Sequence, residues 1–206
     1  MIKIKVCGIT NLDDALAAVE LGVDALGFNF YKKSPRFIEP QRAAQIINQL
    51  PPFTVPVGIF VNEREERIRE ITSQACIQGI QLHGDETPEF CQRFGNRVIK
   101  AFQVKDKESL KHMSHYRVSS YLLDSYREGL RGGTGEIFDW HLAVVAKTFG
   151  RIILAGGLTA DNVVEAVKLV QPYGVDVCGG VEREKGMKDH GKMKKFVTAV
   201  RRAARP

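Results

Sequence analysis

Two residues that could move protons stand at the ends of apolar runs. Cys7 ends the run of residues 2–7 and leads into a Gly-Ile-Thr turn, and Asp124 ends the run of residues 121–124. A thiolate can act as a nucleophile or a base, and a partly buried carboxyl group can hold a proton near neutral pH. Each residue also has a structural interpretation, since cysteine often packs as a small hydrophobe and aspartate often caps a helix.

Further polar side chains follow two other apolar runs. Arg36 lies in a loop stiffened by a proline, and its guanidinium could bind a carboxylate through two parallel hydrogen bonds or remain a solvated surface group. Gln81 and His83 lie at the end of the run of residues 79–82. We expect these two to line a pocket rather than to catalyse.

Two glycine pairs suggest an anion site. Gly156-Gly157 follows the run of residues 152–155, and Gly179-Gly180 follows the run of residues 175–178. Without side chains, the backbone amides of such turns can approach an anion closely. Two such turns after the seventh and eighth strands stand where barrel enzymes commonly bind phosphate.

The elements that must position these residues repeat one unit eight times. Short apolar or β-branched runs alternate with stretches of helical periodicity, which is typical of a parallel sheet built from βαβ units. The runs are residues 2–7, 25–29, 55–60, 79–82, 98–102, 121–124, 152–155 and 175–178, and helices are expected over residues 12–21, 41–50, 63–73, 87–93 and 160–169. Helix starts are expected at Asn11, Pro40, Asn62 and Thr159. The count predicts a single α/β domain, residues 1–206, folded as a (β/α)8 TIM barrel; an open doubly wound sheet is the competing fold.

Composition excludes several classes of protein. The chain has 206 residues, 44% hydrophobic and 26% charged, and a net charge of +6. Its four cysteines lack C-x-x-C spacing and no histidine cluster accompanies them, so neither a metal site nor a disulfide framework is expected. We see no signal peptide and no run of ~18 apolar residues, which predicts a cytoplasmic protein without membrane contact. Basic residues gather only in residues 188–205, where an apolar stripe indicates a solvated helix face rather than nucleic-acid binding.

Several motifs in order along the chain resemble phosphoribosylanthranilate isomerases. They are Lys5-Val6-Cys7-Gly8-Ile9-Thr10, Gly27-Phe28 with Ser34-Pro35-Arg36, Gly58-Ile59-Phe60-Val61-Asn62, Gln81-Leu82-His83-Gly84-Asp85, Leu122-Leu123-Asp124, Gly132-Gly133-Thr134-Gly135 and Leu154-Ala155-Gly156-Gly157-Leu158. The resemblance implies an Amadori-type isomerisation of N-(5-phosphoribosyl)anthranilate in tryptophan biosynthesis, with no cofactor. It implies that Asp124 is the general acid and Cys7 the general base. It also implies that Arg36 binds the anthranilate carboxylate and that the two glycine loops bind the phosphate of this small-molecule substrate.

The chain departs from the family after the eighth strand. Where the family usually has Ser-Ser-Gly-Val-Glu, this chain has Cys178-Gly179-Gly180-Val181-Glu182. If backbone amides supply most of the phosphate contact, the loop still works, with affinity lower by one or two hydrogen bonds of ~1 kcal/mol each. Substrate affinity, rather than reaction type, is what this departure affects.

Two other functions remain open from the residues. Lys100 lies within an apolar run, where a packing or hydrogen-bonding role is typical, but a Schiff-base aldolase would use such a lysine. A non-catalytic binder of phosphorylated ligands would need only the glycine loops. The sequence leaves monomer and homodimer equally open, because a two-fold interface carries no necessary motif.

Overall fold

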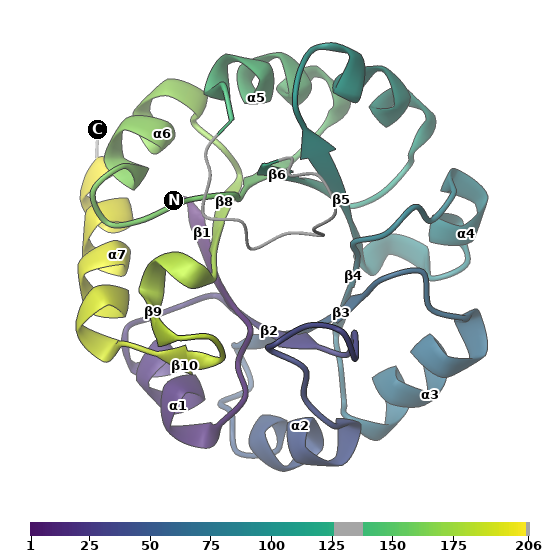
Figure 1. Ribbon diagram of the computed structural model, residues 1–206, viewed down its shortest axis with the longest axis vertical. Helices are drawn as coiled ribbons and strands as arrows, with labels where there is room; N and C mark the ends of the chain where they lie inside the picture. Colours follow the sequence, from purple (N-terminus) through teal and green to yellow (C-terminus); the bar gives the residue numbers. More distant parts are fainter. Residues whose placement is uncertain (126–137, 205–206) are drawn as a thin grey trace.

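Eight parallel strands form a closed barrel in the computed structural model, which describes residues 1–125 and 138–204. Each strand pairs with its neighbours in chain order, and β8 closes the ring by pairing with β1 (Figure 1). The strands are β1 Lys3–Cys7, β2 Ala25–Asn29, β3 Val55–Phe60, β4 Gly79–Leu82, β5 Val98–Val104, β6 Ser120–Ser125, β7 Ile152–Leu154 and β8 Gly174–Val177. The predicted (β/α)8 barrel is therefore confirmed. The motif Gly132-Gly133-Thr134-Gly135 lies outside the described residues.

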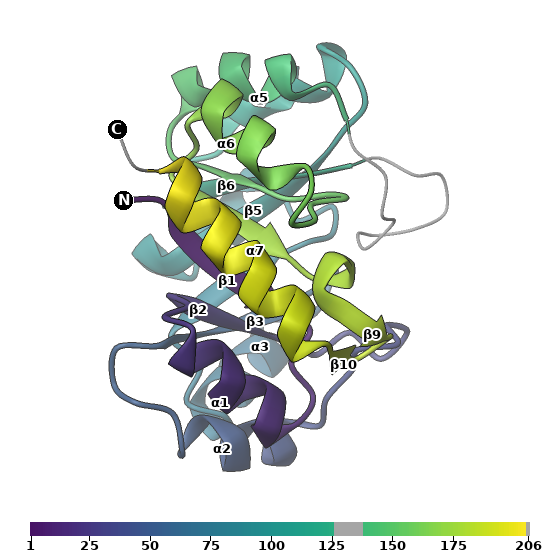
Figure 2. The same ribbon diagram turned by 90° about the vertical axis from the view of Figure 1, so that its left-hand side faces the viewer.

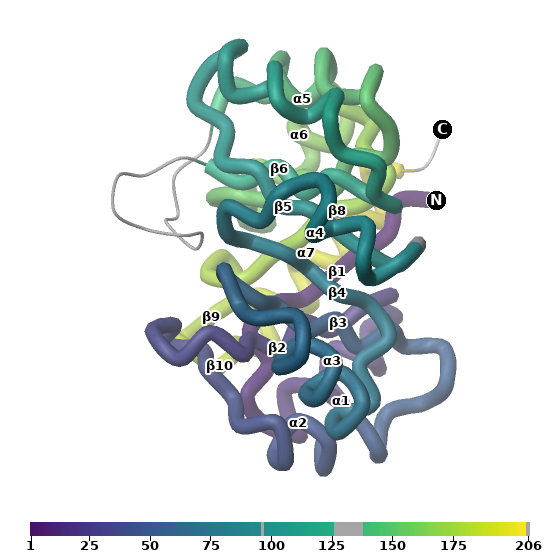
Figure 3. Tube along the Cα trace, turned by 90° about the vertical axis from the view of Figure 1, so that its right-hand side faces the viewer, coloured from purple at the N-terminus to yellow at the C-terminus, as the bar shows by residue number. Residues whose placement is uncertain are grey.

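Helices surround the barrel on its outer side (Figures 1 and 3). They are α1 Leu12–Glu20, α2 Pro40–Ile47, α3 Glu65–Gln74, α4 Pro88–Gln92, α5 Trp140–Ala146, α6 Val163–Val170 and α7 His190–Ala203, with 3-10 helices η1 Gly95–Arg97, η2 Glu108–His115 and η3 Lys147–Phe149. The chain between β5 and β6 therefore carries η2 where the other units carry an α-helix. The predicted apolar stripe of α7 is buried between α1 and α6.

Side chains alternate between the two faces of each strand, and this alternation selects what enters the barrel. Ile4 and Val6 of β1 join the large core between strands and helices, so Lys5 and Cys7 point inward. Gln81 of β4 and Asp124 of β6 also point inward, because their neighbours Ile80, Leu82 and Leu123 belong to the large core. A smaller apolar cluster fills part of the interior and consists of Ala101, Leu122, Ile153 and Ala155.

Two predicted helix starts are wrong. Asn62 has a left-handed backbone with φ 51°, and α3 begins only at Glu65. The side chain of Asn62 instead accepts a hydrogen bond from the amide of Asp85 at 2.6 Å, which joins the loops after β3 and β4. Thr159 likewise precedes a loop rather than a helix, since α6 begins at Val163. In both places a loop-to-loop or loop-internal bond replaces the cap, while the cap of α1 by Asn11 is confirmed.

A small addition follows β8. The 3-10 turn η4 Gly179–Val181 leads into an antiparallel pair, β9 Glu182–Glu184 and β10 Met187–Lys188. Figure 2 shows this pair at the end of the barrel opposite the two termini. The pair returns the chain to β1, which brings charged side chains to the carboxyl ends of the strands. Within the described residues, every helix is too short or too polar to cross a membrane.

Candidate active site

The carboxyl ends of β1, β6 and β8 bring the predicted proton-transfer residues to one mouth. Cys7 ends β1, and Asp124 lies one residue before the end of β6. Asp176 of β8 is near both: burial raises its pKa to about 6, and the negative charges of Cys7 and Asp124 contribute to that rise. In a barrel of parallel strands these ends share one rim. Cys7 and Asp124 therefore face the same space, as the eight-unit count predicts.

Two buried ammonium groups flank Cys7. Lys5 forms an ion pair with Asp176, with 2.9 Å between Nζ and Oδ1. Lys188, whose side chain is fully buried, donates to the carbonyl oxygen of Cys7 at 2.6 Å and to Glu182 Oε1 at 2.9 Å. Buried charges act strongly on their neighbours because little water screens them. The sulfur of Cys7 therefore lies in a positive local field.

This field favours the thiolate of Cys7. The interaction with the Cys178 thiol is the largest influence on the pKa of Cys7 and lowers it, whereas burial raises it. The charges of Lys5 and Lys188 lower the pKa further, and the balance leaves it well below the ordinary value of a thiol. Burial lowers the pKa of Lys5, but the charges of Asp176 and Cys7 outweigh burial and raise it above the ordinary value. Thiolate and ammonium thus stabilise each other.

Asp124 has different neighbours. Its side chain is buried, Oδ1 accepts a hydrogen bond from the amide of Ser125 at 2.9 Å, and Oδ2 lies 3.4 Å from Nε2 of His83. Nδ1 of His83 lies 2.8 Å from the side-chain nitrogen of Gln81. Nε2 of His83 and the side-chain oxygen of Gln81 are buried and make no hydrogen bond within the described residues. Gln81 and His83 therefore lie beside Asp124 at the mouth with polar atoms that a ligand could bind.

Arg36 reaches the mouth from the loop after β2. Its Nε and Nη2 donate to the two carboxylate oxygens of Glu182 at 2.8 and 2.6 Å. These bonds raise the pKa of Arg36 above its ordinary value. Burial raises the pKa of Glu182, but its bonds to Arg36 and Lys188 outweigh burial and lower the pKa. The bidentate pair holds the guanidinium in a fixed plane beside Cys178.

The two glycine loops meet at the mouth. A Cβ on Gly180 would collide with the carbonyl oxygen of Leu158, so only glycine lets the loops after β7 and β8 approach this closely. Gly156, with φ +77°, would place a Cβ 2.5 Å from the amide nitrogen of Ser125 and 3.0 Å from Asp124 Oδ1. Gly157 also has a positive φ, and Gly179 lies near Arg36. The predicted anion site thus adjoins both Asp124 and Arg36.

Lys100 lies outside this group. Its neighbours Ile99 and Ala101 belong to the interior cluster, so Lys100 points outward. Its ammonium donates to the carbonyl oxygens of Leu82, Gly84 and Ala101 at 3.3, 2.8 and 3.1 Å and to the Glu86 carboxylate at 3.1 Å. An ammonium bonded to four oxygens is not available as an amine nucleophile. Its position supports the loop that carries His83.

Four charged groups around Cys7 were not predicted from the sequence: Lys5, Asp176, Glu182 and Lys188. Two of them carry a signal in the pattern. Lys5 stands two residues before Cys7 on the same strand face, and Asp176 interrupts an apolar run between two valines. Glu182 and Lys188 reach the mouth only through the β9–β10 pair, and the sequence of that pair has no periodic pattern that would predict it. Among the described residues, no group of three or more His, Cys, Asp or Glu side chains is arranged to hold a metal ion.

The match to a family model is as extensive as the motifs suggest. Residues 4–199 match the model described as N-(5'-phosphoribosyl)anthranilate (PRA) isomerase. The chain belongs to this family. An N-(5'-phosphoribosyl)anthranilate isomerase from Geotalea uraniireducens is 56% identical over 197 residues, covering 96% of this chain and 97% of the relative.

Solved structures of phosphoribosylanthranilate isomerases have the same barrel. The crystal structure of monomers of the dimeric enzyme from Thermotoga maritima superposes with a TM-score of 0.89 at 39% identity, covering 98% of this chain and 99% of that one. A phosphoribosylanthranilate isomerase in complex with reduced 1-(o-carboxyphenylamino)-1-deoxyribulose 5-phosphate superposes with a TM-score of 0.89 at 40% identity, with the same coverage.

Proposed function

We propose that the chain isomerises N-(5-phosphoribosyl)anthranilate to 1-(2-carboxyphenylamino)-1-deoxyribulose 5-phosphate by general acid/base catalysis, as a step of tryptophan biosynthesis. The observation that carries the proposal is one barrel mouth that combines a thiol of lowered pKa, Cys7, with a buried carboxyl group, Asp124. Membership of the phosphoribosylanthranilate isomerase family supports this choice of substrate.

The reaction begins at the furanose ring. Asp124, as a carboxylic acid, donates its proton to the ring oxygen, while the lone pair of the anilino nitrogen opens the C1–O bond. The ring oxygen becomes a hydroxyl group and C1 becomes an iminium carbon. The His83 ring lies beside Asp124 on the β4 side, with Nε2 3.4 Å from Oδ2. The iminium withdraws electrons from C2 and so acidifies its proton.

Cys7 completes the proton transfer. Its thiolate removes the C2 proton, and the electron pair of that bond forms the enolamine. The Cys7 thiol then gives its proton to C1, and the C2 enol hydroxyl loses its proton to the Asp124 carboxylate. The product is the ketone, and Cys7 is again a thiolate and Asp124 again a carboxylic acid. Protons balance over the cycle, and no redox cofactor enters.

Charged groups around the mouth hold the substrate. The pair with Glu182 uses Nε and Nη2 of Arg36, so the outer Nη1 edge faces away from Glu182 and can bind the anthranilate carboxylate. The backbone amides of Gly156, Gly157, Gly179 and Gly180 bind the phosphate. Gly156 against Asp124 sets the distance between phosphate and acid.

The direct test follows the loss of substrate fluorescence as the anthranilate derivative is consumed. Replacing Cys7→Ser or Asp124→Asn is expected to lower kcat by a factor of 10² to 10⁴, the range for removal of a general acid or base. Cys76→Ser and Asp13→Asn, conservative changes at exposed positions, serve as matched controls and keep full activity. Full activity in either site variant would overturn the assignment of that residue.

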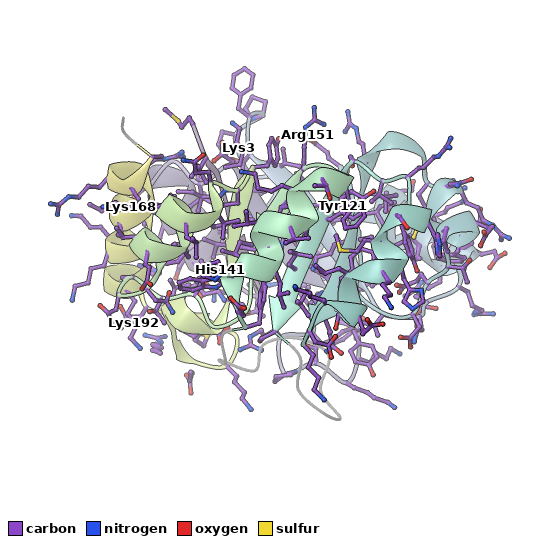
Figure 4. The ribbon with its side chains drawn as sticks, turned by 90° about the horizontal axis from the view of Figure 1, so that it is seen from above. Lys3, Tyr121, His141, Arg151, Lys168 and Lys192 are labelled. Atoms are coloured by element: carbon purple, nitrogen blue, oxygen red, sulfur yellow. The ribbon has the colours of Figure 1, made fainter. Side chains whose placement is uncertain are left out.

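We also propose that the chain forms a homodimer through the amino ends of its strands. A cavity of about 460 Å³ opens on that end, and its lining includes Phe53, Val55, Ile99 and Tyr173. The side chain of Phe53 is 95% exposed, although it is large and apolar. Figure 4 shows Lys3 and Arg151, which also line the cavity, at the barrel edge away from Lys192.

A second copy of the chain fits this surface best. Across a two-fold axis, the protruding phenyl ring of Phe53 in each copy can insert into the cavity of the other copy. The same surface on both copies is then complementary to itself. The relative from Thermotoga maritima is dimeric. The catalytic mouth lies at the other end of the barrel and stays open in such a dimer.

Light scattering after size-exclusion chromatography tests the dimer. The unmodified chain is expected to give twice its own mass and Phe53→Asp the mass of one chain, with activity retained. Val145→Asp, at a half-exposed valine of α5, is the matched control and leaves the dimer intact. A single-chain mass for the unmodified protein would refute the proposal.

We place the enzyme in the cytoplasm. All four cysteines are free thiols, and free thiols persist in a reducing compartment.

A further inference from the structure

Cys178 lies beside Cys7 across the closure of the barrel. β1 and β8 pair with Lys5 opposite Asp176 and Val6 opposite Val177, so the next residues on each strand, Cys7 and Cys178, stand side by side. Neighbouring strands are about 4.8 Å apart, which brings two thiols on one face within contact. The pKa of each thiol depends on the presence of the other.

Other neighbours confine the sulfur of Cys7. On the β2 side, a Cβ on Gly27 would stand only 2.9 Å from Cys7 Sγ, so the sulfur rests against that glycine. Gly8 leaves similarly little room beside the sulfur of Cys178, since a Cβ on Gly8 would stand 3.1 Å from Cys178 Sγ. With β2 on one side and Cys178 on the other, the sulfur of Cys7 is held in one position.

The charges around the pair place the shared proton on Cys178. Cys178 Sγ donates to Glu182 Oε1 at 3.8 Å, and a carboxylate beside a sulfur disfavours its thiolate. Lys188 Nζ lies 3.9 Å from Cys178 Sγ, but its charge lowers the pKa of both thiols and so does not favour one over the other. Lys5 stands next to Cys7 and favours the thiolate there. Glu182 Oε1 already accepts shorter bonds from Arg36, Lys188 and the amide of Gly186, at 2.8, 2.9 and 3.2 Å. The bond from Cys178 to Glu182 is long, and its S–H can turn to the sulfur of Cys7 instead.

We propose that Cys178 is a positioning residue for the catalytic base: its S–H donates a hydrogen bond to the sulfur of Cys7 and keeps that sulfur ionised and aimed into the mouth. The inference rests on the proposed role of Cys7. It also changes the meaning of the departure from the family pattern at this position. Cys178 is a donor to the base instead of a lost phosphate ligand.

The electrostatics agree with the geometry. The bond from Cys178 is the strongest single influence on the pKa of Cys7, ahead of burial and of the two lysines. The same contact raises the pKa of Cys178 well above the ordinary value, so the two thiols do not ionise together. The charged and titratable groups that face Cys7 from the elements packed around it are Lys5, Arg36, Asp176, Cys178 and Lys188.

The test measures ionisation of Cys7 without using turnover. The rate of alkylation by iodoacetamide is followed against pH, and the Cys7 adduct is quantified in its own peptide by mass spectrometry. Removing a hydrogen bond to a charged group shifts a pKa by about one to two units, so Cys178→Ala is expected to raise the midpoint by about that amount and to slow alkylation roughly ten-fold or more at pH values below the midpoint of the unmodified protein. Cys178→Ser restores both, because a hydroxyl also donates.

Two further variants separate this effect from a packing defect. Cys178→Val keeps the volume without a donor and is expected to behave as Cys178→Ala. Cys91→Ala removes a buried thiol elsewhere, whose pKa burial raises to about 11, and leaves the midpoint unchanged. A midpoint that stays within about 0.3 units in Cys178→Ala, or a serine variant that matches alanine, would overturn the proposal.

The acid limb of kcat/KM distinguishes the two levels of inference. If Cys7 is the base, the limb moves together with the alkylation midpoint in each variant. A midpoint that moves while the limb stays fixed refutes the role of Cys7 in turnover and leaves the hydrogen bond from Cys178 established.

Discussion

The two sides of the mouth use different means to prepare a group for proton transfer. On the β8–β1 side, Cys7 lies among fully charged neighbours, above all the buried pair of Lys5 and Asp176. On the β4–β6 side, Asp124 is bordered by a backbone amide and by the imidazole of His83. The base is surrounded by ion pairs and the acid by dipoles.

The difference follows from the direction of proton flow. A thiol near its ordinary pKa is mostly protonated at neutral pH, so a base made from it needs positive charge nearby. A carboxyl group is ionised too easily, and an adjacent lysine would remove its proton before the substrate arrived. Asp124 lies beside the Ser125 amide and the His83 ring, and no lysine among the described residues forms an ion pair with it. The two sides of the mouth therefore differ in the charge placed beside the reacting group.

The largest expected effect comes from breaking the ion pair on the base side. Lys5→Met leaves the Asp176 charge buried without its partner, which is expected to lower the free energy of unfolding by about 3–5 kcal/mol. On the acid side, Gln81→Met removes one neutral hydrogen bond and is expected to cost about 1 kcal/mol. Urea unfolding followed by the fluorescence of Trp140, the single tryptophan, measures both. Equal losses of unfolding free energy in the two variants would contradict the proposed difference between a charged base side and an uncharged acid side.

A second effect concerns pH and Asp176. Its pKa in the folded chain, about 6, lies above the ordinary 3.8. A raised carboxyl pKa contributes stability that is fully present below the unfolded value and is lost as pH rises through the folded value. Asparagine does not titrate. Between pH 4 and pH 7, the free energy of unfolding of Asp176→Asn is therefore expected to rise by on the order of 2–3 kcal/mol relative to that of the unmodified protein. This change does not depend on how far the two proteins differ in stability at pH 4.

Thermal or urea unfolding at several pH values provides the measurement for Asp176. A parallel pH dependence in the two proteins would show that Asp176 titrates at its ordinary value, and its charge would then stay constant over this pH range.

The smallest effect belongs to the acid side. His83→Gln removes the buried Nε2, which makes no hydrogen bond within the described residues and can bind the substrate, and is expected to lower kcat roughly ten-fold, the effect of one hydrogen bond to a charged or polar group. The acid limb of the pH profile, set by Cys7, stays in place because His83 lies on the other side of the mouth. Steady-state kinetics across pH measure both quantities. A shift of the acid limb in His83→Gln would show that His83 affects the ionisation of Cys7, so the two sides of the mouth would not act independently.

The strand pattern predicted most of this arrangement for a physical reason. Cys7 and Asp124 end runs whose inward and outward faces alternate, so counting the runs places both at one rim. The helix starts predicted at Asn62 and Thr159 are wrong because other hydrogen bonds replace the helix caps there. The bond of Asn62 joins two loops, and the bond between Thr159 and Asn162 lies within one loop. Lys188 and Glu182 could not be placed at all, since their positions depend on a short antiparallel pair with no periodic signal.

The closure of the ring links the first residues of the chain to the last. Lys5 is separated from Asp176 by 171 residues, Cys7 from Lys188 by 181, and Arg36 from Glu182 by 146. On a ribosome, synthesis runs toward the C-terminus, so Lys188 is added 181 residues after Cys7. Contacts of such long separation form late in folding. A nascent or truncated chain therefore carries Cys7 as an ordinary thiol, and the reactive thiolate appears only when the barrel has closed.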